Sequence, residues 1–314
     1  MIFFSKQTSV ILLLHRVNPL RDKMWDPMDP ELFENILRYI HRKFHVISLN
    51  ELLFYPPEKS SKPFAAITFD DGYHDFLDYS FPILKRFNFH STLFVVTDCI
   101  ENNTPTWTYL VDYLFENSCK LQLSDFKFPD LPSEFKNGKW LNRDARMNYG
   151  KRFKQYLKWI PSVARKAIIN SLIDNFNDVK NPDGMMLSWK ELGEIKAAGI
   201  EIGSHSTTHS TLASIENENE LKQELEVSAK ILKEKLGTIS PVFSYPCGSY
   251  NEHVKTFTQN AGYKAGLAVN GRLYNSSKED LFEVPRIELY NQSWIKTKMR
   301  INGTMSFIEK TLKR

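Results

Sequence analysis

The sequence predicts an α/β fold in which parallel strands are covered by helices. Short apolar runs bounded by polar turns recur along the chain, and most of them are separated by segments with helical periodicity. Strands and helices that alternate in this way favour a parallel sheet with the helices packed outside it. The expected strands are 10–14, 64–69, 91–96, 200–203, 242–245 and 263–269, and the expected helices include 30–42, 73–87 and 216–236.

Composition and charge are typical of a globular protein with a full core. Of 314 residues, 42% are hydrophobic and 25% are charged, which excludes a disordered or fibrous chain. The net charge is +4 and the basic residues are scattered, so we expect no nucleic-acid partner. One modest basic cluster comprises Lys151, Arg152, Lys154 and Lys158, and we interpret it as a solvated helix face rather than a site for an anionic surface or polymer.

The cysteines and the apolar runs indicate the cellular compartment of the protein. Cys99, Cys119 and Cys247 are odd in number and form no CxxC pair, so we expect neither a disulfide framework nor a cysteine–zinc site. A reducing compartment fits, and the expected location is cytoplasmic. The opening "MIFFSKQTSVILLLHRV" has no basic n-region and only a short apolar run, which favours a buried strand over a signal peptide. No run approaches the roughly 18 apolar residues of a transmembrane helix, which leaves only peripheral contact with a membrane.

Residues 100–185 interrupt the alternation of strands and helices. The stretch is aromatic and basic, contains no obvious buried strand, and includes the helix-like segments "WTYLVDYLFEN" and "RMNYGKRFKQYLKWI". We therefore expect a single domain over 1–314 with a mainly helical insertion at 100–185. The insertion is either a cap over a site or an addition to the surface.

Carboxylates and imidazoles follow several of the expected strands. His15, Asp70, Asp71 and His205 each lie just past such a strand, where the active residues of parallel α/β folds gather. His205 and His209 in "GSHSTTH" are four residues apart, a spacing that in a helix or tight helical turn puts both rings on one face. An HxxxH pair is also common on surfaces, and "DDG" is also typical of a plain turn. Together, however, a carboxylate and two imidazoles predict a site for a first-row divalent metal.

The motifs together resemble a known family. "AITFDDGY", "GSHSTTH" with its lead-in "LSWKELGEIKAAGIEIGSHS", "FSYPCGSYN" and "AGYKAGLAVN" are similar, in order, to motifs of polysaccharide deacetylases with the NodB homology domain, carbohydrate esterase family 4. The resemblance covers 8–99 and 186–290 and implies a distorted (β/α)7 barrel with a divalent metal, most often zinc; the ligand set also suits nickel, cobalt or iron. Carried over, it makes Asp71, His205 and His209 the metal ligands and Asp70 the general base.

The third motif departs from the family pattern. Many members have Arg-x-Pro-Tyr where this chain has "SYPC" at 244–247. The backbone N–H of Cys247 is then the expected donor to the reaction's oxyanion, and Tyr245 is an expected substrate contact. The missing arginine normally orients the base, and Arg286 in "EVPRIEL" is the expected replacement; the alternative is that Arg286 forms an ordinary ion pair.

The acid motif also departs from the usual order. Many members carry a general-acid histidine in a late motif, but no histidine follows residue 270 here. "ILLLHRV" resembles the opening of a subset with circularly permuted motifs, which makes His15 the acid, although Leu14 replaces the usual tyrosine. A histidine after "LLL" is also typical of a structural residue. Trp107 of the insertion is a further expected substrate contact, because flat rings suit sugar faces.

The expected function is metal-dependent removal of acetyl groups, most often N-acetyl, from a sugar or glycan precursor in bacterial surface polysaccharide metabolism. Two alternatives remain open: an amidase acting on a non-sugar C–N bond, and a catalytically degenerate glycan-binding module. The intact Asp70, Asp71, His205 and His209 argue against degeneration.

Overall fold

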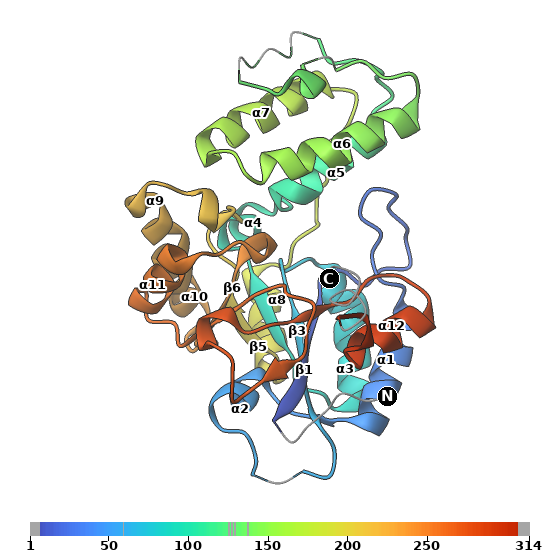
Figure 1. Ribbon diagram of the computed structural model, residues 1–314. Coiled ribbons are helices and arrows are strands. Elements are labelled where there is room, and N and C mark those ends of the chain that lie inside the picture. Colours follow the sequence, from blue (N-terminus) through green and yellow to red (C-terminus); the bar gives the residue numbers. More distant parts are fainter. Residues whose placement is uncertain are drawn as a thin grey trace.

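A computed structural model describes residues 7–306 except 59, 125, 127, 129 and 137 (Figure 1). The ends of the expected 1–314 domain, including the first six residues of the opening segment, lie outside the described residues. The strands are β1 (Thr8–Leu14), β2 (His45–Val46), β3 (Phe64–Phe69), β4 (Thr92–Val95), β5 (Glu201–Ser204), β6 (Val242–Ser244), β7 (Ala265–Leu267), β8 (Tyr274–Asn275) and β9 (Ile287–Glu288). The helices are α1 (Pro30–Lys43), α2 (Leu49–Phe54), α3 (Phe81–Phe87), α4 (Thr97–Asn102), α5 (Trp107–Asn117), α6 (Arg143–Leu157), α7 (Ser162–Asn175), α8 (Trp189–Ala197), α9 (Glu218–Lys222), α10 (Ser228–Leu236), α11 (Glu252–Asn260) and α12 (Trp294–Ile301).

The strands form one curled, mostly parallel sheet in the order β7-β6-β5-β4-β3-β1-β8. β2 pairs with β3, β9 pairs with β1, and β8 is antiparallel to β1. The segment that leads into β9 also bridges to β7, where Val284 pairs with Leu267. The chain from Val284 to β9 therefore joins the two edges of the sheet, and the expected distorted barrel is confirmed.

The core explains why these strands form. Val10 to Leu14 of β1 are buried without interruption, as expected for a parallel strand covered on both faces. The six strands expected from apolar runs occur within two residues of their predicted ends. β2, β8 and β9 were not predicted, because two-residue strands carry no periodicity.

Two expected helices are interrupted. The helix predicted over 73–87 is instead a π-helical turn, Phe76–Ser80, followed by α3, and Pro82 lies at the junction with no N–H to donate. The helix predicted over 216–236 contains a second π-helical turn, Gln223–Val227, between α9 and α10. Each π turn lies in the helical segment that follows a strand bearing a functional motif.

The insertion between β4 and β5 is mainly helical. In Figure 1, α6 and α7 lie beyond one end of the sheet, with α5 between them and the barrel. These helices share an apolar cluster of their own, centred on Phe115, Phe153 and Phe176. Gly150 of α6 faces Phe115 of α5 so closely that a Cβ there would lie 2.5 Å from the ring.

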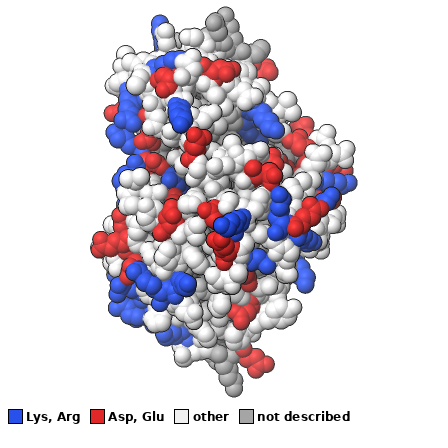
Figure 2. Space-filling model, turned by 180° about the vertical axis from the view of Figure 1, so that it is seen from behind, with Lys and Arg blue, Asp and Glu red and all other residues white. Residues whose placement is uncertain are grey.

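Surface charge is mixed on the face opposite to that view. Figure 2 shows basic and acidic side chains interspersed over it. No helix among the described residues is long and apolar enough to cross a membrane.

Candidate metal centre and active site

The "DDG" turn gives its two aspartates different partners. Asp71 has a left-handed backbone with φ of 79°, which is strained for a residue with a side chain, and Gly72 follows with φ of 88°. A Cβ at Gly72 would lie 2.9 Å from the Val95 side chain, so both its conformation and its surroundings require glycine. Both carboxylates are buried: Asp70 pairs with an arginine, and Asp71 faces two histidines.

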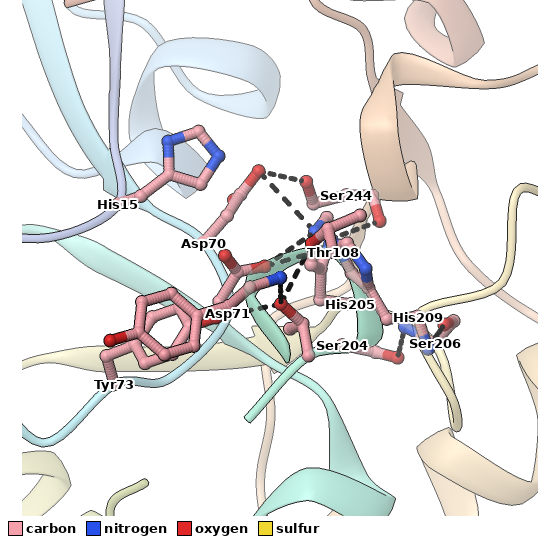
Figure 3. Close-up of polar contacts among 12 residues, drawn as sticks. His15, Asp70, Asp71, Tyr73, Thr108, Ser204, His205, Ser206, His209 and Ser244 are labelled. Carbon is pink, nitrogen blue, oxygen red and sulfur yellow. Dashed lines mark hydrogen bonds and ion pairs between the residues drawn. The ribbon is translucent and has the colours of Figure 1, made fainter. Parts of the chain in front are cut away.

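Asp71, His205 and His209 converge as a candidate metal centre. Asp71 Oδ1 lies 3.4 Å from His205 Nε2 and 3.3 Å from His209 Nε2, and one ligand atom from each residue lies within 4.8 Å of the others (Figure 3). His205 donates from Nδ1 to the Ser244 carbonyl at 2.8 Å, which leaves Nε2 as the acceptor. Asp71 Oδ1 is buried and has no hydrogen-bond partner among the described residues. A cation at this point would satisfy that oxygen, so the residues fit a metal.

The ionisation of the triad suits a divalent cation. Burial lowers the pKa of His205 to about 4, so its ring is neutral near pH 7 and keeps a lone pair. Burial tends to raise the pKa of Asp71, but His209 together with His15 and His205 outweighs this effect, and the pKa is lowered. Two imidazoles and a carboxylate are typical ligands of zinc and other first-row metals, and they leave positions open for water and substrate.

The loop that carries the two histidines is not helical, contrary to the helical turn expected from their spacing. Ser206 and His209 have φ of 67° and 60°, so the backbone is left-handed at both residues, which no α-helical turn allows. Glu224 of the second π turn stabilises the loop by accepting from the N–H groups of Thr207 and Thr208, at 3.1 and 2.9 Å. The Thr208 hydroxyl also donates to this buried carboxylate.

Asp70 lies beside the triad in a fully buried pair with Arg286. Both guanidinium Nη atoms donate to the carboxylate at 2.8 Å. The Ser244 hydroxyl donates to Asp70 Oδ2 at 3.0 Å (Figure 3). The same hydroxyl accepts from Arg286 Nη2 at 2.9 Å. Burial tends to raise the pKa of Asp70, but Arg286 outweighs it, and the pKa is held well below the usual range. Asp70 is therefore ionised and able to accept a proton at neutral pH.

His15 lies at the end of β1, on the other side of Asp70 from the triad (Figure 3). It is partly exposed, and its Nδ1 lies 3.8 Å from Glu288. Its ring meets Trp25 edge-on, with centroids 5.5 Å apart. The loop that carries Trp25 is attached to the insertion, because Glu116 accepts from the N–H groups of Lys23 and Met24 at 2.9 Å each.

One cavity of about 170 Å³ connects these groups. Its described lining comprises His15, Trp25, Asp70, Asp71, Thr108, Tyr109, Asp112, Lys154, Lys158, His205, His209, Tyr245, Cys247, Gly248, Val269 and Glu288. A second cavity of about 180 Å³ shares His15, Trp25 and Glu288 with the first, so the two hollows adjoin at this wall.

The expected substrate contacts differ in their placement. Trp107 is not among the lining residues; its indole N–H donates to the His209 carbonyl at 2.8 Å, and Arg165 lies over its ring. Tyr109, two residues further along α5, does line the cavity. Tyr245 lines it too, but its hydroxyl donates to the Phe282 carbonyl. Cys247 lines the cavity with a left-handed φ of 55°.

The basic cluster on α6 is not simply a solvated face. Lys151 and Arg152 are exposed, as expected. Lys154, however, forms an ion pair with the buried Asp112 of α5, and both Lys154 and Lys158 line the cavity. The interpretation was wrong for these two lysines, because α5 packs against the face of α6 that carries them.

Sequence reasoning missed several residues of this site, among them Ser244, Glu288, Trp25 and Glu224. A signal for Glu288 was present: Arg286 and Glu288 are two apart in an extended segment, which puts both side chains on one face. Trp25 and Glu224 had no comparable signal, because their roles depend on loops and a π turn that periodicity does not predict.

Comparisons with known proteins agree with this arrangement. The family model for "Polysaccharide deacetylase" matches residues 58–266, and no curated protein matches the chain. The chain is similar in structure to the deacetylase PplD of Streptococcus pyogenes, described in complex with acetate, with 16% identity, a TM-score of 0.63 and coverage of 95% of this chain and 99% of that one. It is also similar to IcaB from Ammonifex degensii (16% identity, TM-score 0.60, 95% and 98% covered) and to a de-N-acetylase from Aggregatibacter actinomycetemcomitans (14% identity, TM-score 0.54, 94% and 99% covered).

The site is a buried Asp-His-His group at the strand ends of a barrel. This arrangement is that of a class of metal-dependent hydrolases. The family match extends over more than half of the chain, so this protein belongs to the polysaccharide deacetylase family. His15 and Arg286 lie outside the matched residues.

Proposed function

We propose that the protein hydrolyses the N-acetyl group of an acetamido sugar within a glycan or glycan precursor. The observation that supports this best is the side-by-side placement of an ionised, arginine-bound Asp70 and the Asp71-His205-His209 group in one cavity. Family membership and the de-N-acetylase named among the similar structures support the same substrate class. The adjoining second cavity provides room for a neighbouring part of a glycan.

Each group has a definite chemical task in this proposal. Asp71, His205 and His209 would hold a divalent cation, most often zinc in such ligand sets, which as a Lewis acid polarises the acetyl carbonyl and acidifies water. Asp70 accepts the proton of the water that attacks the acetyl carbon. The N–H of Cys247 is the proposed donor to the oxyanion that forms.

His15 completes the reaction by donating a proton to the departing nitrogen. An amine anion is a very poor leaving group, so amide hydrolysis requires an acid at that atom. His15 lines the same cavity as Asp70, and Glu288 lies 3.8 Å from its Nδ1. Glycan deacetylation in bacterial surface polysaccharide metabolism, on a cytoplasmic precursor, is the setting we propose; the free cysteines are compatible with a reducing compartment.

Acetate release tests the proposal. The metal-loaded chain is incubated with a panel of acetamido sugars, acetylated oligosaccharides and non-sugar acetamides, and free acetate is measured. Asp70→Asn should keep the metal but lower the rate on the order of 10²–10⁴-fold, because the amide cannot accept the proton. Release only from non-sugar amides would identify an amidase instead, and metal binding without release from any substrate would favour a binding module.

A further inference from the structure

Most of the charged side chains that line the active cavity lie beside an oppositely charged side chain or a histidine. Asp70 pairs with Arg286, Asp71 faces the two histidines, Glu288 lies beside His15, and Asp112 pairs with Lys154. Lys158 also lines the cavity, and it forms no ion pair with a carboxylate in the described part of the chain. Lys158 is therefore a cationic side chain of the cavity wall that has no carboxylate partner in the described part of the chain.

The Lys158 side chain lies at a defined position in the cavity wall. It follows the last residue of α6 and is half-buried, on the wall formed by the insertion. Asp112 of the same cavity wall is close enough to interact electrostatically with both Lys154 and Lys158. The Asp112 carboxylate is already paired with Lys154, however, so Lys158 remains available to an anion from outside the chain.

We infer that Lys158 forms a subsite for a phosphate group attached to the acetamido sugar, so that the substrate is a sugar phosphate or sugar diphosphate rather than an uncharged glycan. This inference deepens the proposed function and rests on it. Because Lys158 and the triad line one cavity of about 170 Å³, the phosphate belongs to the sugar that carries the acetyl group or to the linkage beside it.

Phosphate fits better than carboxylate. A lysine ammonium is a compact point charge and a common phosphate ligand, and a phosphate monoester carries more negative charge near pH 7 than a carboxylate. None of the described residues that line the cavity is an arginine. A divalent cation held by the triad would add positive charge to the same space, which further favours an anionic substrate.

Equilibrium binding to the metal-free chain tests the subsite separately from catalysis, because a bound metal would itself attract phosphate. The probes are N-acetylglucosamine 1-phosphate and the uncharged methyl glycoside of N-acetylglucosamine, measured by calorimetry. We expect the phosphate to bind roughly 10- to 100-fold more tightly, the range of a hydrogen bond to a charged group. Equal affinity for the two sugars would overturn the inference.

Matched variants then attribute the preference to one side chain. Lys158→Met should abolish the preference for the phosphate, and Lys158→Arg should retain most of it. Lys151→Met is the control, since Lys151 lies on α6, which Lys158 directly follows, but is exposed and does not line the cavity. A preference that survives in Lys158→Met, or that is lost equally in Lys151→Met, would contradict the assignment.

Binding measurements with three further ligands show which kind of molecule carries the negative charge. A UDP-linked sugar and a short-chain polyprenyl diphosphate sugar represent nucleotide and lipid carriers, and binding of either that depends on Lys158 supports the subsite and names the source. Glucuronic acid tests the carboxylate: binding to it with the same dependence on Lys158 would overturn the assignment to phosphate.

Different experimental results would reject the phosphate subsite and the proposed deacetylase function. Acetate release from neutral sugars, with no Lys158-dependent binding, would remove the subsite and leave the deacetylase. Lys158-dependent binding of the sugar phosphate, with no acetate released by the metal-loaded chain from any acetamido sugar, would leave the subsite and remove the deacetylase.

Discussion

Asp70 keeps its negative charge in a fully buried place because Arg286 compensates it with two hydrogen bonds of 2.8 Å. The arginine comes from the segment before β9, not from β6 where many family members carry theirs. Ser244 occupies that β6 position, and its small hydroxyl both leaves room for the relocated guanidinium and bonds to it. The pair is thus formed between the end of β3 and the segment before β9, and Ser244 of β6 bonds to both side chains.

Removing this arginine should change the pH dependence of the reaction. Asp70 acts as a base only when ionised, and Arg286 lowers its pKa against the opposing effect of burial. Arg286→Met should therefore move the acidic limb of the kcat/KM profile to higher pH, whereas Arg286→Lys should move it less. The variant should also lose about 3–5 kcal/mol of stability, since it leaves a buried charge unpaired. An unchanged acidic limb in a folded Arg286→Met protein would show that Asp70 is not the titrating base.

Replacement of His15 should affect substrates according to their leaving group. His15→Ala should retain the metal, because His15 lies outside the candidate metal group. Amide hydrolysis should fall on the order of 10²–10⁴-fold, since no group protonates the nitrogen. An aryl acetate, whose leaving group needs no proton, should lose much less. Equal losses on both substrates would assign His15 a structural role.

At the scale of elements, the π turns position the active loops. A π turn adds a residue to a helix and so redirects the side chains around it, which is why such turns occur often at functional sites. In the turn Gln223–Val227 this places Glu224 inward, against the loop of the two histidines, and leaves Glu226 exposed. The other π turn, Phe76–Ser80, comes earlier in the chain and follows the "DDG" motif.

Glu224 should therefore affect metal affinity without touching the metal. Glu224→Gln keeps the size of the side chain but loses an acceptor for the loop N–H and hydroxyl groups. Changes to residues that orient metal ligands typically cost 10–100-fold in affinity, and we expect a loss in that range by competition with a chelating dye. Glu226→Gln is the matched control from the same turn. Wild-type affinity in Glu224→Gln would mean that the loop holds its shape unaided.

The sequence predicts the elements whose signals are local. Asp70, Asp71 and His205 could be placed because each directly follows an apolar run, and parallel strands bring such positions to one end of a barrel. The left-handed backbone of Ser206 and His209 could not be predicted, since it depends on contacts with Glu224 and with Trp107 from distant segments. Lys154 was misinterpreted for a similar reason: its partner Asp112 lies 42 residues away on another helix.

At the scale of the whole molecule, the insertion forms one wall of the cavity and the barrel forms the rest. α5 contacts two loops of the barrel. Trp107 donates to the His209 carbonyl in the loop of the two histidines, and Glu116 accepts from two N–H groups in the loop of Trp25. Arg165 of α7 reinforces this junction through Ser210. The insertion therefore contacts both the loop of His205 and His209 and the loop of Trp25 beside His15.

Metal binding should stabilise this assembly as a unit. The triad joins the ends of β3 and β5, and Asp71 Oδ1 lacks a hydrogen-bond partner among the described residues. A cation present at about 1,000 times its Kd stabilises the folded state by roughly 4 kcal/mol, which corresponds to a rise in Tm on the order of 10 °C. Removal with EDTA should lower Tm by that amount, as measured by differential scanning calorimetry, and zinc should restore it. The double variant with His205→Ala and His209→Ala is the control and should show no rise with zinc, because Asp71 alone holds the cation weakly. A similar rise in that variant would place the stabilising metal at another site.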